Sequence, residues 1–152
     1  VPAVPWRDPY TVSPQDLAAY IGTLERRCEE QPGSPELRTC LGMAHAVNYD
    51  VGRSMEALEA AVEIDPTYFW SRLKYGELLY RLRALDRAEE ETLKAVDLAA
   101  NALELAMARK QLREIRAINP VRVRLDAPAS ARGRAFFLSA LMAIAVAVVM
   151  WT

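Results

Sequence analysis

The sequence predicts an all-α protein, namely a short array of helical hairpins followed by one C-terminal transmembrane helix. Three observations lead to this fold class. Landmark residues recur at a spacing of 34 positions, prolines and short polar segments interrupt the helical pattern at regular places, and a long uncharged apolar run ends the chain. A length of 152 residues fits a single domain.

The repeat is the strongest of these signals. A fixed period of this size is typical of solenoid arrays, in which each unit buries its apolar face only by stacking on the next. We therefore expect the helices to form one continuous stack. The landmarks that share this spacing are Pro32 with Pro66, Leu41-Gly42 with Tyr75-Gly76, and Leu58–Ala61 with Thr92–Ala95.

The segment 35–66 resembles the tetratricopeptide repeat, a helix–turn–helix unit that has this same period. A second unit, residues 69–98, departs from the pattern at Thr92, where a large apolar residue is usual, and at Ala100, where the closing proline is missing. Upstream, residues 14–31 align with the second helix of a unit alone. The resemblance implies a small, membrane-anchored member of the family. The matching positions are Leu41, Gly42, Ser54, Leu58, Ala61 and Pro66, then Tyr75, Gly76, Leu79, Ala88, Leu93 and Ala95.

Packing and stop signals support each element. Small residues such as Gly42 and Gly76 allow neighbouring helices to approach closely. Pro66 ends one helix, because the residue before a proline is pushed out of helical geometry, and Asn119-Pro120 ends the last one. We expect helices over about 14–31, 36–48, 52–64, 69–83, 86–99 and 101–118. The predicted organisation is an extended Pro-rich arm (1–13), the helical domain (14–118), a basic juxtamembrane linker (119–134) and a transmembrane helix (135–152).

The C-terminal run Ala135–Trp151 contains no charged residue, and Ser139 is its only polar one. As a helix its 17 residues would span about 25 Å, near the lower limit for crossing the hydrocarbon core. A buried core helix is the alternative, but a chain of this length has little interior for a helix that is apolar on all sides. The predicted interface residues are Arg122, Arg124, Arg132 and Arg134 on the near side and Trp151 on the far side.

Charge is distributed unevenly along the chain. Residues 1–104 carry 18 acidic and 11 basic side chains, whereas residues 105–134 carry two acidic and eight basic ones. Because basic residues beside a span favour the cytoplasmic side, we expect a single-pass protein with its N-terminal domain in the cytoplasm. The Arg-rich, Lys-poor composition indicates a bacterial inner membrane. The acidic body argues against a nucleic-acid partner, and the alternation over 121–126 is either an extended tether or a strand for a partner's sheet edge.

The first residues form a separate arm. Pro2, Pro5 and Pro9 favour an extended backbone near polyproline geometry. Trp6 and Tyr10 are its large side chains. They either pack back onto the first helix or bind a partner, and we list them as partner-binding candidates.

Catalytic chemistry has little support in the sequence. The only imidazole, His45, has a repeat position that normally packs between helices, and Cys28 and Cys40 are expected to be free, buried thiols. No glycine-rich phosphate loop and no metal-binding or nucleophile motif occurs. We therefore predict no enzyme, no cofactor, no metal and no small-molecule substrate.

Binding of another protein is the remaining role. The resemblance implies that the first helix of each repeat lines a concave side. Helical spacing and this alignment select a partner-binding groove, although the same residues could instead pack against a neighbouring helix of this chain. Some family members grip chaperone tails through Lys and Asn, but here those positions hold Thr39, Met43, Leu73 and Glu77. The predicted groove residues are Met43, Trp70, Leu73, Glu77, Tyr80 and Arg81.

These observations predict a non-catalytic, membrane-anchored protein-interaction module. It would act as an accessory subunit that docks on or stabilises a multi-subunit membrane protein complex. The expected partners are other protein subunits and the lipid bilayer. Two alternatives are a transient assembly factor for such a complex and a tail-anchored organelle adaptor that recruits a soluble partner, with a layout like that of the mitochondrial fission adaptor.

Overall fold

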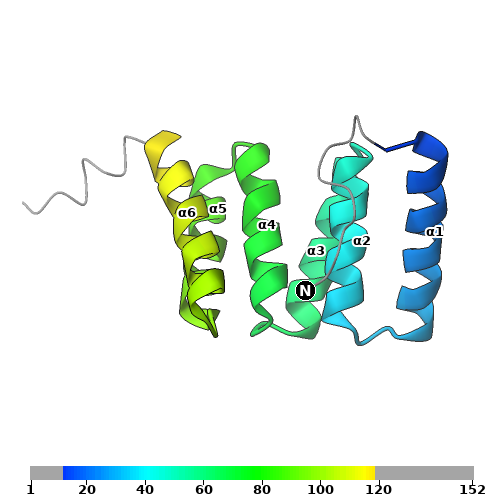
Figure 1. The fold of residues 1–152 in the computed structure, drawn as a ribbon, viewed down its shortest axis with the longest axis horizontal. Helices are drawn as coiled ribbons and strands as arrows, with labels where there is room; N and C mark the ends of the chain where they lie inside the picture. Colours follow the sequence, from blue (N-terminus) through cyan, green and yellow to red (C-terminus); the bar gives the residue numbers. More distant parts are fainter. Residues whose placement is uncertain (1–11, 119–152) are drawn as a thin grey trace, which may run out of the picture. The chain divides into compact units, whose positions relative to one another are not determined.

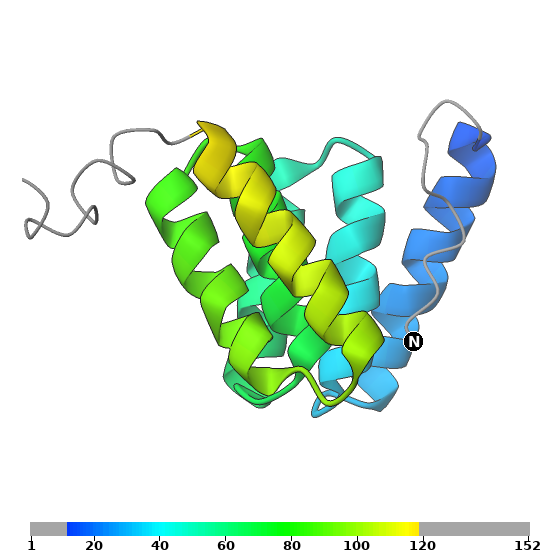
Figure 2. The same cartoon turned by 60° about the vertical axis from the view of Figure 1, so that its left-hand side comes forward.

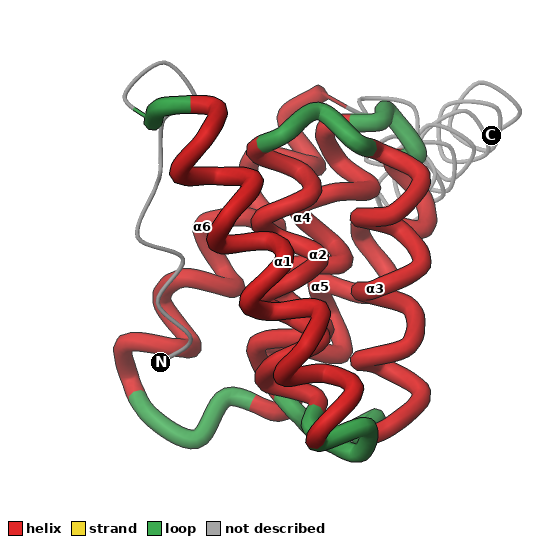
Figure 3. The backbone as a smooth tube through the Cα atoms, turned by 90° about the vertical axis from the view of Figure 1, so that its right-hand side faces the viewer, coloured by secondary structure: helices red, strands yellow, loops and turns green. Residues whose placement is uncertain are grey.

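The computed structural model describes residues 12–118, which form α-helices joined by short turns (Figure 1). The helices begin and end within two residues of the predicted bounds. The prediction of an all-α array is confirmed for this part of the chain, where Figure 3 shows only helices and short loops. The elements are α1 (Pro14–Glu30), α2 (Pro35–Val47), α3 (Val51–Ile64), α4 (Phe69–Arg81), α5 (Leu85–Leu98) and α6 (Ala102–Ile118).

The first three helices begin with side-chain caps. Ser13 Oγ accepts a hydrogen bond from the Asp16 amide at 3.2 Å, and Ser34 Oγ accepts one from the Leu37 amide at 3.3 Å. In both helices a proline follows the cap, at a position where a missing N–H costs nothing. Asp50 caps α3 in the same way.

The turns inside the two hairpins repeat the same geometry. Tyr49 follows α2 with φ 58°, and Arg83, its equivalent in the next repeat, follows α4 with φ 62°. In each turn the backbone N–H of the following residue donates to a carbonyl in the last turn of the helix. The Asp50 N–H donates to the His45 carbonyl at 2.9 Å, and the Ala84 N–H donates to the Leu79 carbonyl at 3.0 Å. This left-handed ending closes each helix after the same number of residues.

The helices pack in chain order. α2 and α3 form one hairpin and α4 and α5 the next, while α1 packs on α2 and α6 packs on α5 with a smaller contact to α4 (Figure 2). Three apolar clusters make the core. The first joins α1 and α2 and includes Ala57 of α3, the second joins α3 to α4, α5 and α6, and the third joins α4, α5 and α6.

Two glycines set the closeness of the hairpins. A Cβ at Gly42 would lie 2.6 Å from Leu58 Cγ, and one at Gly76 would lie 2.7 Å from Thr92 Oγ1. The Ser54 hydroxyl donates to the Gly42 carbonyl at 2.7 Å across the same contact. The repeat glycines therefore serve close approach, as their spacing predicts.

Several predictions fall outside the described residues. They are the Pro-rich arm with Trp6 and Tyr10, the basic linker 119–134, the span 135–152, and the interface residues Arg122, Arg124, Arg132, Arg134 and Trp151. Within 12–118, no helix is both long enough and apolar enough to cross a bilayer. The transmembrane part of the predicted fold class stays a prediction.

Candidate protein-binding surface

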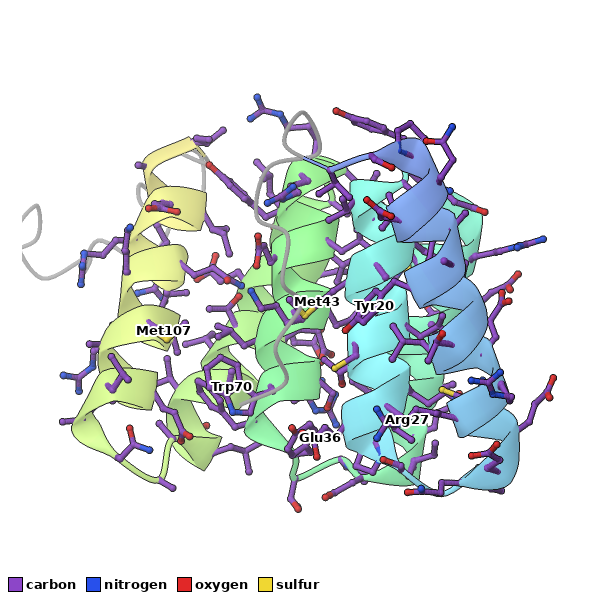
Figure 4. All side chains as sticks on the ribbon, turned by 45° about the vertical axis from the view of Figure 1, so that its right-hand side comes forward. Tyr20, Arg27, Glu36, Met43, Trp70 and Met107 are labelled. Atoms are coloured by element: carbon purple, nitrogen blue, oxygen red, sulfur yellow. The ribbon has the colours of Figure 1, made fainter. Side chains whose placement is uncertain are left out.

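One face of the array gathers large side chains from α1, α2, α4 and α6. Figure 4 shows them on the side turned to the viewer. We call this set the groove face; its central part consists of Met43, Trp70 and Met107, each half-buried. The labelled members are Tyr20, Arg27, Glu36, Met43, Trp70 and Met107.

Trp70 is the anchor of this face. Its ring meets the Phe69 ring edge to face, with centroids 5.1 Å apart and planes at 85°. Together with Met107, it packs on the cluster of α4, α5 and α6 that contains Phe69 and Leu73. The indole is thus held on one side by the core while the other side remains accessible, an arrangement typical of aromatic residues that dominate interfaces.

The prediction for Leu73 is wrong. Its side chain is 2 % exposed and belongs to the core cluster with Ala95 and Ala108. The side chain is buried because α6 lies against α4 at this place. The side-chain Nε2 of Gln111 in α6 donates a hydrogen bond to the Leu73 carbonyl at 3.1 Å. Helical spacing assigns a residue to a stripe, but the neighbouring helix decides which part of the stripe remains open.

The structure adds Met107, which the predicted groove lacks because that prediction considers only the two units 35–66 and 69–98 and not α6. Leu103, Met107 and Gln111 follow one another at spacings of four and therefore share a helix face. The apolar pair at this spacing is the signal that could have identified Met107.

Tyr80 and Arg81 extend the surface toward the other end of α4. Tyr80 is half-buried and packs on the second cluster, which includes Leu79 and Ile115. It lies ten residues after Trp70, which corresponds to about 15 Å along the helix. The predicted residues therefore follow one side of α4 as an extended stripe and do not converge on a single pocket.

A charged triad occupies the middle of that stripe. Glu77 receives hydrogen bonds from Lys74 Nζ and from Arg81 Nη2, each at 2.8 Å. Burial on its own would raise the pKa of Glu77, but the two cations outweigh it and hold the pKa below its usual range. The carboxylate is thus charged and already paired, so it contributes little unpaired charge for a ligand.

The candidate chemical groups are buried. His45 is 3 % exposed, and burial lowers its pKa below the ordinary imidazole value; its Nε2 lies 3.9 Å from Glu25 Oε1. Cys28 and Cys40 are free and buried, and burial raises the pKa of Cys40 to about 11, which keeps the thiol protonated. The predicted burial of His45 and the prediction that Cys28 and Cys40 are free, buried thiols are confirmed.

Metal ligands do not gather in the described part of the chain, where no three or more His, Cys, Asp or Glu side chains lie together in a metal-binding arrangement. The prediction that the protein is not an enzyme remains an expectation about the whole chain. What the geometry offers is a half-buried apolar and aromatic surface on a rigid helical stack.

No family model and no curated protein sequence matches the chain. Solved structures do match. The first TPR of Spaghetti (RPAP3), bound to the HSP90 peptide SRMEEVD, has a TM-score of 0.62 at 19 % identity and covers 70 % of this chain and 82 % of its own. The first TPR domain of human RPAP3, determined by NMR, has a TM-score of 0.62 at 18 % identity and covers 71 % and 83 %.

The likeness to these solved structures agrees with the internal repeat of this chain. The glycines and the left-handed turns both recur at the repeat period, and the helices pair into successive hairpins. Residues 12–118 therefore have the tetratricopeptide-repeat fold.

Proposed function

We propose that this chain is a non-catalytic module that binds a segment of a partner protein along Met43, Trp70 and Tyr80. The observation that carries the proposal is Trp70, a large aromatic side chain fixed by the core on one side and accessible on the other. The RPAP3 domain with a bound HSP90 peptide supports a peptide ligand for this fold.

The ligand we propose is an apolar segment rather than an acidic tail. Thr39 is completely buried and Leu73 almost so, which removes two of the positions that the chaperone-binding members use. Met43 is apolar, and Glu77 is an anion already paired with Lys74 and Arg81. A carboxylate-rich tail would meet no free cation at these positions, whereas an apolar side chain would find Trp70 and Met43.

We further propose that residues 135–152 anchor the domain in a membrane, preceded by the basic linker 119–134. The support is the sequence, namely an uncharged apolar run that follows a linker with the four arginines Arg122, Arg124, Arg132 and Arg134. A cytoplasmic domain on a bacterial inner membrane, acting as an accessory subunit of a membrane complex, follows from this layout. Confinement beside a membrane partner raises the effective concentration, so a modest surface would suffice.

The proposal is tested by pull-down of the full-length protein from native membranes in mild detergent. We expect Trp70→Ala and Tyr80→Ala each to reduce recovery of the partner about tenfold or more, as aromatic interface anchors do. Leu93→Ala is the matched control, because Leu93 is an exposed apolar side chain on α5, away from the stripe. Circular dichroism confirms that each variant is folded.

Recovery of the same partners by Trp70→Ala and Tyr80→Ala would show that this surface is not the binding site. Recovery at fixed stoichiometry favours a stable subunit, whereas substoichiometric recovery favours a transient assembly factor.

A further inference from the structure

Within residues 12–118, α1 has no first-helix partner of the kind that α3 and α5 have. Leu24, Leu58 and Thr92 follow one another at the repeat spacing, which places α1, α3 and α5 as successive second helices. α3 pairs with α2 and α5 with α4, but the corresponding first helix for α1 would begin near residue 1. The sequence there contains Pro2, Pro5 and Pro9, residues that disfavour the interior of a helix.

α1 also differs from α3 in the size of the side chains at the equivalent repeat positions. In α3, Ser54 contacts the first helix through its hydrogen bond to Gly42, and Ala61 lies seven residues later on the same helix face. Both side chains are small and completely buried. The equivalent residues of α1 are Tyr20, which is half-buried, and Arg27, which is exposed. Side chains of this size keep a helix backbone from approaching as closely as α2 approaches α3, but they leave room for a thinner, extended segment.

A hollow of about 220 Å³ lies between α1 and α2 at this place. A cavity of about 150 Å³ holds a benzene molecule, so this hollow is large enough for one aromatic side chain. Its buried floor is apolar and its rim carries one exposed cation and one exposed anion, Arg27 and Glu36 (Figure 4). Its main lining residues are Tyr20, Leu24 and Arg27 from α1 and Glu36, Leu37 and Cys40 from α2.

The chain that precedes α1 can reach this hollow. Val12 already packs on the cluster of α1 and α2, so the chain enters on that side. Leu24 lies ten residues after Pro14, about 15 Å along the helix. Trp6 lies eight residues before Pro14, which is about 25 Å of extended chain, whereas Tyr10 has only about 12 Å. The chain from Pro14 back to Trp6 is therefore long enough to reach the level of Leu24, whereas the chain back to Tyr10 is too short.

Charge complementarity points to the same segment. Trp6 is followed directly by Arg7 and Asp8, one cation and one anion. The rim of the hollow offers the opposite pair, Glu36 and Arg27, so both charges of the arm can be matched when the indole enters.

We propose that residues 1–11 dock back on their own chain with the Trp6 side chain in the hollow between α1 and α2. The arm then occupies the position beside α1 and α2 that a first helix would fill, and it covers the apolar floor of the hollow. The proposal does not depend on the proposed function. It leaves Met43, Trp70 and Met107 as the part of the groove face open to a partner.

Cys40 in the floor of the hollow provides the test. In the full-length protein with Cys28→Ser, in detergent, we measure the rate at which a disulfide reagent modifies Cys40. We expect Trp6→Ala to raise that rate about tenfold or more, because the thiol loses its cover. Tyr10→Ala is the matched control and should change the rate less than about twofold. An unchanged rate in Trp6→Ala would overturn the proposal.

A second measurement covers the case in which Trp6→Ala disturbs folding. With Trp70→Phe and Trp151→Phe, Trp6 becomes the sole tryptophan, and its quenching by acrylamide reports its exposure directly. Strong protection that is independent of protein concentration supports docking within one chain. Quenching equal to that of a free indole, or protection that disappears on dilution and so comes from a second copy, would refute it.

Discussion

Close backbone approach at single residues sets the spacing of this array. Gly42 and Gly22 are both inside helices, yet their surroundings differ. The added Cβ at Gly42 would overlap Leu58, which is 1 % exposed and has no room to move, whereas nothing lies within 4 Å of the one at Gly22. Alanine substitutions at these two glycines therefore separate the cost of overpacking from the gain in helix propensity.

Gly42→Ala should lower the free energy of unfolding by about 1–2 kcal/mol, because overpacking outweighs the gain in helix propensity. Gly22→Ala, the matched control, should raise it by about 0.5–1 kcal/mol. Urea denaturation of both variants measures the difference. A Gly42→Ala protein as stable as the parent would mean that α2 and α3 pack less closely than described.

His45 makes stability depend on pH. Burial lowers its pKa below 6.5, although Asp50 and Glu25 act in the opposite direction and Arg53 adds to the lowering. As the pH falls through 6.5, the unfolded chain binds a proton that the folded chain resists, so the free energy of unfolding decreases. This contribution is fully present above the unfolded-state pKa and is lost on acidification.

We therefore expect the protein to lose stability between about pH 8 and about pH 5.5, and His45→Gln to lose less over the same interval. Urea denaturation at several pH values provides the comparison. An identical pH dependence in both proteins would exclude His45 as its source.

At the scale of elements, the contact of α6 with α4 and α5 explains a departure from the repeat pattern. Thr92 occupies a position where a large apolar residue is usual, and it is completely buried. Its hydroxyl donates to the Ala88 carbonyl at 2.7 Å and accepts from Gln111 Nε2 at 2.9 Å. A polar residue is stable there because α6 brings it a hydrogen-bond donor.

Gln111→Ala should loosen α6 from the array and speed amide hydrogen exchange in α6 more than in α2. A double-mutant cycle of Gln111→Ala with Thr92→Val should give a coupling free energy of about 1 kcal/mol. Each variant removes the same hydrogen bond, the one from Gln111 Nε2 to Thr92 Oγ1. Lys110→Ala is the control, because its side chain is exposed and its pair with Glu114 is long, at 4.0 Å. Uniform acceleration over all helices would instead indicate a general loss of stability.

The helices themselves could be predicted from the sequence because their signals are local. Pro66 ends its helix within one turn, and the close packing at Gly42 recurs at Gly76 because the same short pattern is repeated. The site was harder to predict. Leu73 becomes core only through the position of α6, which the pattern within α4 does not specify. Met107 has a signal in its spacing from Leu103, but that spacing shows a shared helix face and not which face stays accessible. Likewise Tyr20 and Arg27 line the hollow between α1 and α2, which the sequence pattern does not show.

At the scale of the molecule, the apolar core, the basic linker and the uncharged run occupy successive parts of the chain. The apolar clusters of the described region lie within residues 12–118, where the helical unit ends at Ile118. The basic linker and the uncharged run follow it in sequence. Recognition and membrane attachment should therefore be separable by truncation.

A fragment of residues 1–118 should keep the helical circular dichroism of the array and melt within about 2–4 °C of the full chain, because it contains all three apolar clusters of the described region. The full chain should sediment with membranes and need detergent for release, whereas the fragment should stay in the aqueous fraction. A full-length control with Ala143→Arg and Ala147→Arg should also leave the membrane, since each arginine costs about 2.5–3.5 kcal/mol at the bilayer centre. If the full chain and the fragment both remain aqueous without detergent, the C-terminal run is not an anchor; if the fragment unfolds, the helical array depends on residues after Ile118.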